Sequence, residues 1–284
     1  MGETGGRGVA AHPGSRASLP VALVGGGAIA RVIARQLVDA HPEVRLVGAL
    51  DIDPAGARER GFAPEVPLVD SLDALLALGP AFVAECAGHA GLSQHGPGVL
   101  RAGLDLVVAS VGALADARLE ESLRAAAAAG AARIRIPSGA IGALDALASA
   151  RVGGLEQVSY TGRKPPLAWR GTRAESAVDL DRVGAATRLF EGSAREAALA
   201  YPQNANVCAA VGLAGLGLDE TRVELFADPA ARGNEHRLQA SGAFGELRFE
   251  VVGRPLAGNP KTSSLAAYSL IKALVAPARA IAVG

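Results

Sequence analysis

The sequence has few cysteines and no excess of charge of either sign. Cys86 and Cys208 are its two cysteines, and neither belongs to a spacing typical of metal ligands, so we predict two reduced thiols and no metal site. The 28 basic residues balance 28 acidic ones, and no basic run is longer than Arg163-Lys164. We therefore expect neither nucleic acid nor an anionic membrane surface as a partner.

Long hydrophobic runs are also missing. No apolar stretch approaches the roughly 20 residues that a membrane-spanning helix needs. Residues 1–17 are rich in Gly, Ala and Arg and have no apolar centre, which argues against a secretory signal. Position 6 is Gly6 where N-myristoylation requires Ser or Thr. We expect 1–17 to be a disordered tail and the protein to be cytoplasmic.

What the sequence does contain is a glycine turn between an apolar strand and an amphipathic helix. The run VALV at 21–24 predicts a buried strand, and GGGAIA at 25–30 begins a helix with the spacing G-x-G-x-x-A. The first glycine permits a tight turn, the second lets phosphates approach the backbone, and Ala30 lets the helix pack on the sheet. The candidate cofactor-binding residues of this turn are Gly25, Gly27, Ala28 and Ile29. The alternative is a glycine-rich turn that binds nothing.

An acidic residue follows at the distance that dinucleotide-binding folds require. The second expected strand, 44–50, ends at Asp51, whose carboxylate should accept hydrogen bonds from the ribose hydroxyls of NAD and repel a 2′-phosphate. Arg58 lies close enough in sequence to argue for NADP instead. We predict NAD as the cofactor, with NADP as the alternative.

Strands and helices alternate as far as residue 136, which predicts a doubly wound parallel sheet of the Rossmann type over 18–137. Beyond Pro137 the pattern changes to a second, α+β domain with a mixed sheet over 138–261. In it we expect helical pieces over 181–201 and three strands between residues 222 and 252, with a turn near Gly242. A final helix within 262–284 is expected to complete the first domain.

A nicotinamide enzyme needs a group that moves protons beside the reacting carbon, and histidine is the first candidate. His89 lies in an expected loop, 87–91, at the carboxyl end of the fourth strand, where a cofactor or substrate would lie. His236 begins a strand of the second domain. From the residues alone, a structural role for His236 is more common than a catalytic one.

Four further residues are candidates for binding anions or amides. Arg163 and Lys164 precede two prolines in an expected loop, 162–167, and suit a substrate carboxylate, with a solvated loop as the alternative. Ser138 is expected to open a helix whose N–H groups could hold an anion. Asn206 either caps a helix or contacts the cofactor amide.

Several segments together resemble the L-aspartate dehydrogenase family, over about residues 19–276. The glycine motif is common to many enzymes. The combination of YPQNANV at 201–207, NEH at 234–236 and NPKTS at 259–263 is far more specific. Tyr201 stands where the family usually has Phe. The segments are GGGAIA at 25–30, PSGAIG at 137–142, RKPP at 163–166, LFEGSAREA at 189–197, YPQNANV at 201–207, NEH at 234–236 and NPKTS at 259–263.

The resemblance implies oxidation of L-aspartate with NAD or NADP to oxaloacetate and ammonia through iminoaspartate, reversibly, in a homodimer. By analogy, it also implies a supply of iminoaspartate for NAD biosynthesis. It gives the catalytic role to His236 and cofactor contacts to Ala140 and Asn206. The alternatives are another two-domain Rossmann oxidoreductase, similar to homoserine dehydrogenase or dihydrodipicolinate reductase, and an NAD-binding sensor without turnover.

Overall fold

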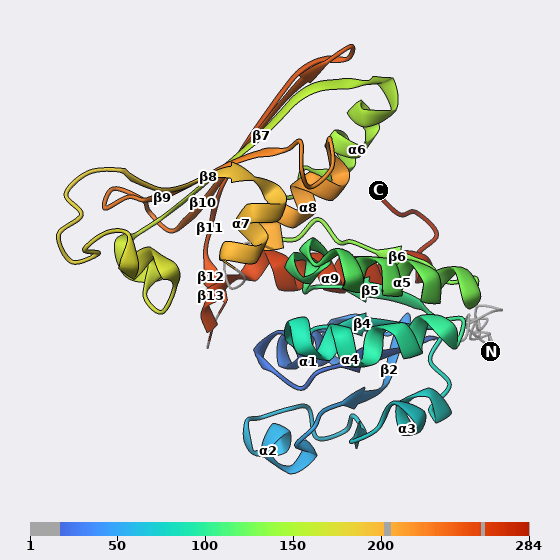
Figure 1. Ribbon diagram of the computed structural model, residues 1–284. Helices are drawn as coiled ribbons and strands as arrows, with labels where there is room; N and C mark the ends of the chain where they lie inside the picture. Colours follow the sequence, from blue (N-terminus) through green and yellow to red (C-terminus); the bar gives the residue numbers. More distant parts are fainter. Residues whose placement is uncertain (1–17, 202–205, 257–258, 284) are drawn as a thin grey trace, which may run out of the picture.

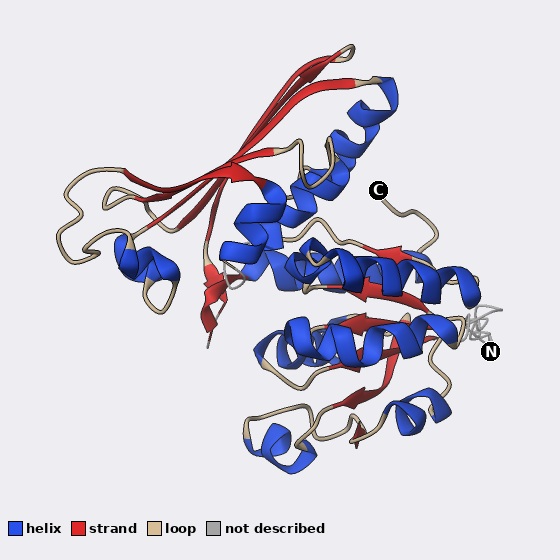
Figure 2. Cartoon of the chain, in the orientation of Figure 1, coloured by secondary structure: helices blue, strands red, loops and turns tan. Residues whose placement is uncertain are grey.

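The chain forms two large sheets with helices between them, and one small two-stranded sheet (Figures 1 and 2). The computed structural model describes residues 18–201, 206–256 and 259–283, so the expected tail, 1–17, lies outside the described residues. The first sheet has six parallel strands and the second has five strands in mixed orientation, which confirms the predicted fold class. Among the described helices, none is long and apolar enough to cross a membrane.

The first sheet is doubly wound, with the order β3-β2-β1-β4-β5-β6. Its strands are β1 (Leu19–Val24), β2 (Val44–Leu50), β3 (Leu68–Val69), β4 (Phe82–Glu85), β5 (Asp105–Val108) and β6 (Ile134–Arg135). The strand order reverses between β1 and β4, which is where open α/β sheets bind ligands. Gly25 lies at this point with φ of +110°, and an added Cβ would come within 2.9 Å of the backbone of Cys86 and Ala87. Both the turn and this close approach require glycine.

Both faces of the first sheet are covered. Val21 and Leu23 of β1 pack with α1 and α9, whereas Ala22 and Val24 point to the opposite face, toward α3 and α4. Burial on both faces explains why these strands are continuous apolar runs. The helices are α1 (Ala28–Ala40), α2 (Pro54–Glu59), α3 (Leu72–Ala77), α4 (Gly88–Arg101), α5 (Ala117–Ala129) and the C-terminal α9 (Ser264–Val275), with the 3₁₀ turn η1 (Val111–Ala115) after β5.

The second sheet has the order β11-β10-β7-β9-β8. Strands β7 and β9 are parallel and the other neighbours are antiparallel, with the expected β10–β11 hairpin turning at 243–244. Helices α6 (Leu144–Gly153), α7 (Ala194–Ala200) and α8 (Asn206–Ala214) cover the face turned toward the first sheet (Figure 1). The strands are β7 (Leu155–Lys164), β8 (Thr187–Ser193), β9 (Arg222–Ala227), β10 (Asn234–Gly242) and β11 (Gly245–Gly253); a small sheet joins β12 (Pro255–Leu256) and β13 (Asn259–Ser263).

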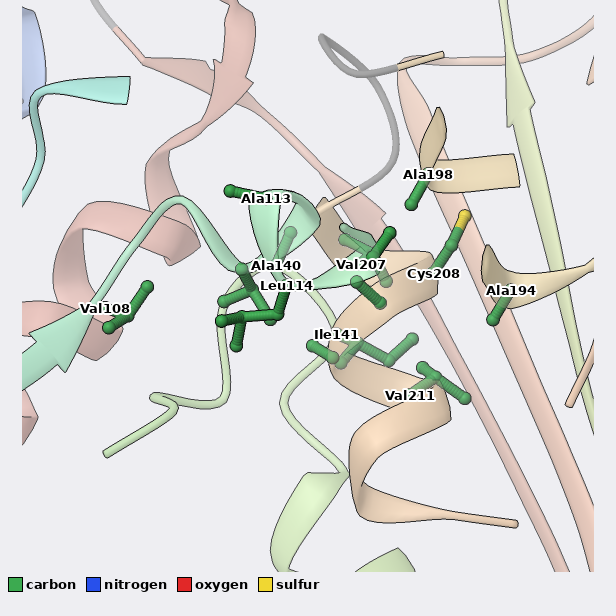
Figure 3. Close-up of a cluster of buried hydrophobic side chains, with 14 of the residues drawn as sticks. Val108, Ala113, Leu114, Ala140, Ile141, Ala194, Ala198, Val207, Cys208 and Val211 are labelled. Carbon is green, nitrogen blue, oxygen red and sulfur yellow. The ribbon is translucent and has the colours of Figure 1, made fainter. Parts of the chain in front are cut away.

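A continuous apolar cluster joins the two sheets through α8 (Figure 3). Val207 and Val211 of α8 pack in it with Leu114 of η1, Ile141 and Val108 of β5. Burying a side chain of this kind contributes about 1.5–3 kcal/mol. The cluster therefore fixes the position of β7 and β10 relative to the glycine turn.

Two expected segments differ in the first half of the chain. The expected loop at 87–91 is the first turn of α4, because the carboxylate of Glu85 accepts hydrogen bonds from the N–H groups of Ala87 (2.7 Å) and Gly88 (3.0 Å). The helix expected to open at Ser138 begins only at Leu144. The intervening residues form turns because Gly139 and Gly142 have φ of +59° and +80°.

The second half also contains a correction. Within 181–201, where helical pieces were expected, Thr187–Ser193 is the edge strand β8, paired with β9. Only α7 is an α-helix there, and Ser193 and Glu196 start it with a capping box. Pairing with a distant strand decided the conformation of 187–193, and no local pattern records that pairing.

Candidate active site

The N-terminus of α1 is open toward the crevice at the edge of the first sheet. Gly27 is its N-cap, no side chain caps the helix, and its first turn carries no acidic residue. An added Cβ at Gly27 would meet nothing within 4 Å. The N–H groups at the start of the helix, next to Ala28 and Ile29, therefore face open space, which fits a dinucleotide pyrophosphate.

Asp51 organises the glycine turn. Its Oδ2 accepts a hydrogen bond from Gly26 N–H (2.7 Å) and its Oδ1 accepts one from Asp53 N–H (2.9 Å). An added Cβ at Gly26 would lie 2.6 Å from that Oδ2. Sequence reasoning gave no role to Gly26. The available signal was a glycine at a position where the G-x-G spacing does not require one.

The cation nearest to Asp51 is Arg60, with 3.8 Å between Nη2 and Oδ1. Arg58, the expected argument for NADP, donates instead to the backbone carbonyls of Phe62, Ala63 and Val66. It therefore braces the segment after α2 and does not face Asp51.

A pocket of about 120 Å³ lies between the first sheet, α8, α9 and the ends of β7 and β10. Six of the predicted site residues line it together: Ile29, Ser138, Ala140, Lys164, Asn206 and His236. Ile29 and His236, which are 207 positions apart in the sequence, thus line one cavity.

His236 lies on β10 and is 4% exposed. Its Nδ1 is 2.6 Å from the hydroxyl of Tyr160, and its Nε2 is buried with no hydrogen-bond partner among the described residues. Burial, with a smaller contribution from Lys164, lowers the pKa of His236 to about 3. The imidazole is therefore neutral at neutral pH and has the form required of a base.

Lys164 is 6% exposed, and its ammonium group lies 5.3 Å from the centre of the Trp169 ring. Burial lowers its pKa to about 8, so it is mostly charged at neutral pH. A buried cation that lines a pocket beside a neutral histidine suits an anionic substrate.

Arg163 and Lys164 lie on opposite faces of one strand. They end strand β7, where we expected a loop, so their side chains point to opposite faces of the sheet. Arg163 lies over the Phe226 ring, contacts Asp228 (3.4 Å) and is absent from the pocket lining.

The remaining predicted residues hold neighbouring segments in place. Asn206 Oδ1 accepts a hydrogen bond from Gly112 N–H (2.9 Å), which ties α8 to η1. An added Cβ at Gly112 would lie 3.3 Å from Nε2 of His89, so His89 is close to Asn206 but beside the pocket lining. Next to Ser138, the N–H of Gly139 donates to Ser269 Oγ on α9 (3.1 Å).

Sequence reasoning gave no role to several residues that complete the site. Asn234, 8% exposed, and Ser269 line the pocket, and Tyr160 contacts His236. Asn234 and His236 share one face of β10, and this period of two was the signal that could have found Asn234. Tyr160 lies 76 positions from its histidine and had no such signal.

Family models match both halves of the chain. Residues 145–276 match the family described as aspartate dehydrogenase, C-terminal, and residues 25–137 match the NAD binding domain of homoserine dehydrogenase. The solved homoserine dehydrogenase of Thiobacillus denitrificans shares 15% identity at a TM-score of 0.60, over 90% of this chain and 73% of its own, and shows the fold alone.

Proteins similar to nearly the whole chain are described as aspartate dehydrogenases. The L-aspartate dehydrogenase of Cupriavidus necator is 47% identical over 93% of this chain and 100% of its own. That of Ruegeria pomeroyi is 50% identical over 89% and 90%. The solved aspartate dehydrogenase of Thermotoga maritima has a TM-score of 0.71 at 26% identity, over 94% and 99%. The chain belongs to the L-aspartate dehydrogenase family.

Proposed function

We propose that the protein oxidises L-aspartate to oxaloacetate and ammonia through iminoaspartate, reversibly, with NAD or NADP as the hydride acceptor. The observation that carries this proposal is that a buried cation, Lys164, and a neutral buried histidine, His236, line one pocket with Ile29 of the glycine-turn helix. The relatives named above support the substrate.

The chain's own residues divide the chemistry between binding and proton transfer. The cofactor, when bound, supplies the acceptor for the hydride that leaves Cα. Lys164 binds a substrate carboxylate and holds Cα near the open end of α1. We assign this role to Lys164 rather than to Arg163, because Arg163 lies on the other face of β7. Ser138 and Ala140 shape the pocket wall, and Asn206 keeps η1 against it.

His236 handles the proton of water in the second half of the reaction. Water attacks the imine carbon, and Nε2 of His236 takes a proton from that water. The imidazolium then returns this proton to the nitrogen, which gives a carbinolamine. The hydroxyl proton of the carbinolamine passes to the nitrogen by the same route as the C–N bond breaks, so that the carbonyl group of oxaloacetate forms and ammonia leaves. A neutral imidazole is ready for the first of these steps without a preceding deprotonation.

We propose NAD as the preferred cofactor because Asp51 follows the end of β2 and lies beside the glycine turn, where the acidic residue of this fold contacts the ribose. Asp51→Asn keeps an acceptor for Gly26 N–H but removes the charge that repels a 2′-phosphate. The ratio of kcat/KM with NAD to kcat/KM with NADP should fall by about 10- to 100-fold, the scale of one charged hydrogen bond. Steady-state kinetics with both cofactors measures this ratio. Asp53→Asn, at an exposed neighbour, should leave it unchanged, and an unchanged ratio in Asp51→Asn would refute the assignment.

We also propose a cytoplasmic homodimer that supplies iminoaspartate for NAD biosynthesis, with domains divided as in the sequence-based prediction. Both cysteines are free, which supports a reducing compartment.

The face of the second sheet turned away from α6, α7 and α8 carries no helix in the described chain (Figure 1), which supports a second copy there. Sedimentation should give twice the mass of one chain.

A substrate panel tests the reaction. Purified protein with NAD or NADP is offered L-aspartate, D-aspartate, L-glutamate and L-homoserine, and nicotinamide absorbance is followed. We expect reduction with L-aspartate only. Reduction with L-homoserine would favour the homoserine dehydrogenase-like alternative. Unchanged nicotinamide absorbance with every substrate, although NAD binds, would favour a sensor.

A further inference from the structure

The pocket face of strand β7 places His236 between two other side chains. Tyr160, Gly162 and Lys164 alternate along one face of this strand, and each is buried. On the neighbouring strand β10, His236 is paired directly with Gly162. His236 therefore lies opposite the one residue of this face that has no side chain, between the positions of Tyr160 and Lys164.

Tyr160 is the partner of the histidine inside the protein. Its hydroxyl oxygen is 2.6 Å from Nδ1, and the two rings are stacked at 24° with their centres 5.9 Å apart. Tyr160 is 2% exposed, and its hydroxyl has no other hydrogen-bond partner in the described ranges. The opposite ring nitrogen, Nε2, is the one left to act in the pocket.

Gly162 makes this contact sterically feasible. An added Cβ would lie 2.9 Å from the Tyr160 hydroxyl oxygen and 3.0 Å from Cδ2 of Leu225. Its φ is not in the left-handed region. Glycine is therefore needed here because it has no side chain, and not because of the backbone conformation. A side chain at 162 would push the hydroxyl away from Nδ1.

We propose that Tyr160 is the positioning residue of the active site: its hydroxyl oxygen accepts a hydrogen bond from Nδ1–H of His236 and so presents the Nε2 lone pair to the reacting water. This inference rests on the proposed role of His236. Proton transfer occurs at Nε2 in both directions, so the Nδ1 proton and its bond to Tyr160 persist through the cycle. A phenol, unlike a carboxylate, holds the ring without adding a negative charge that would favour the imidazolium.

The first test compares two buried tyrosines. Tyr160→Phe keeps the stacked ring and removes only the hydroxyl, and we expect kcat to fall about 10- to 100-fold, part of the contribution of a positioned acid–base group. KM for L-aspartate and NAD should stay within about threefold, and the solvent deuterium isotope effect on kcat should rise because proton transfer becomes slower. Tyr201→Phe is the matched control: it removes a buried hydroxyl that bonds Leu189 O (3.3 Å) outside the pocket, and it should leave kcat unchanged.

The second test moves the hydroxyl without removing it. Gly162→Ala should lower kcat with little change in KM, like Tyr160→Phe. In the Tyr160→Phe background the added methyl group has no hydroxyl to displace, so the double variant should be no slower than Tyr160→Phe alone. Thermal unfolding of each variant shows whether a loss of stability contributes.

The outcomes separate this inference from the proposed function. If His236→Ala is inactive and Tyr160→Phe keeps wild-type kcat and isotope effect, the positioning role is wrong and the role of His236 stands. If His236→Ala itself keeps wild-type kcat, the proposed function of the histidine fails. Equal losses in Tyr160→Phe and Tyr201→Phe, or strictly multiplicative losses in the double variant, would also overturn the positioning role.

Discussion

Replacing His236 with Ala should lower kcat for L-aspartate oxidation by about 10²- to 10⁴-fold, the contribution of a general acid–base group. The reason is that water attacking the imine would lose the group that takes its proton. Hydride transfer precedes this step, so mixing the variant with L-aspartate and NAD should give a rapid burst of up to one reduced nicotinamide per site and then a slow phase. Stopped-flow absorbance measures both phases.

The controls for this prediction separate chemistry from folding. His236 is buried, so the affinity of the variant for NAD and its unfolding temperature are measured beside its turnover. His95→Ala on α4 removes a histidine that is absent from the pocket lining and should keep wild-type kcat. A folded His236→Ala protein with wild-type steady-state turnover would contradict the acid–base role.

Lys164→Met should lower kcat/KM for L-aspartate by about 10- to 100-fold, because one charged hydrogen bond to the substrate carboxylate is lost. Arg163→Met provides the matched comparison at the adjacent position. It removes a partly exposed ion pair with Asp228 and should change kcat/KM by less than about threefold. The reverse order of effects would move the carboxylate site to Arg163.

The low pKa of Lys164 also makes substrate binding depend on pH. Its ammonium group is charged below about pH 8 and loses its proton above it, so affinity for a dicarboxylate is complete below this pH and falls as pH rises through it. Succinate, which has no amine, isolates this effect as a competitive inhibitor of L-aspartate. Its inhibition constant should rise above about pH 8 in the wild type and stay pH-independent in Lys164→Met. A wild-type constant that is flat from pH 7 to 10 would contradict this assignment.

The sequence predicted those parts of the site whose residues lie close together along the chain. The glycine turn and Asp51 follow from a strand, a turn and a helix whose signals lie within about 30 residues of one another. Lys164 and Arg163 show the limit of this reasoning. They are adjacent in sequence and were predicted together, yet extended backbone sends them to opposite faces of β7. The prolines that follow them favoured a loop over this strand.

Contacts between distant strands account for most of what the sequence could not predict. The Tyr160–His236 contact depends on the register of β7 against β10, and β8 exists because β9 lies beside it. The helix expected to open at Ser138 begins instead at Leu144, because Gly139 and Gly142 have positive φ. Role assignment for His236 required the family resemblance, because a buried histidine on a strand is commonly structural.

The measurement that tests the central claim most directly follows the hydrogen on the substrate Cα. L-aspartate carrying deuterium at Cα is incubated with the protein and NAD, and the nicotinamide and organic acid products are analysed by mass spectrometry. The account predicts one deuterium in the reduced nicotinamide for each oxaloacetate and ammonia formed. In Lys164→Met, the amounts of deuterated nicotinamide and of oxaloacetate should fall together. Reduced nicotinamide without deuterium, or none at all while NAD is bound, would contradict the claim that this pocket oxidises L-aspartate.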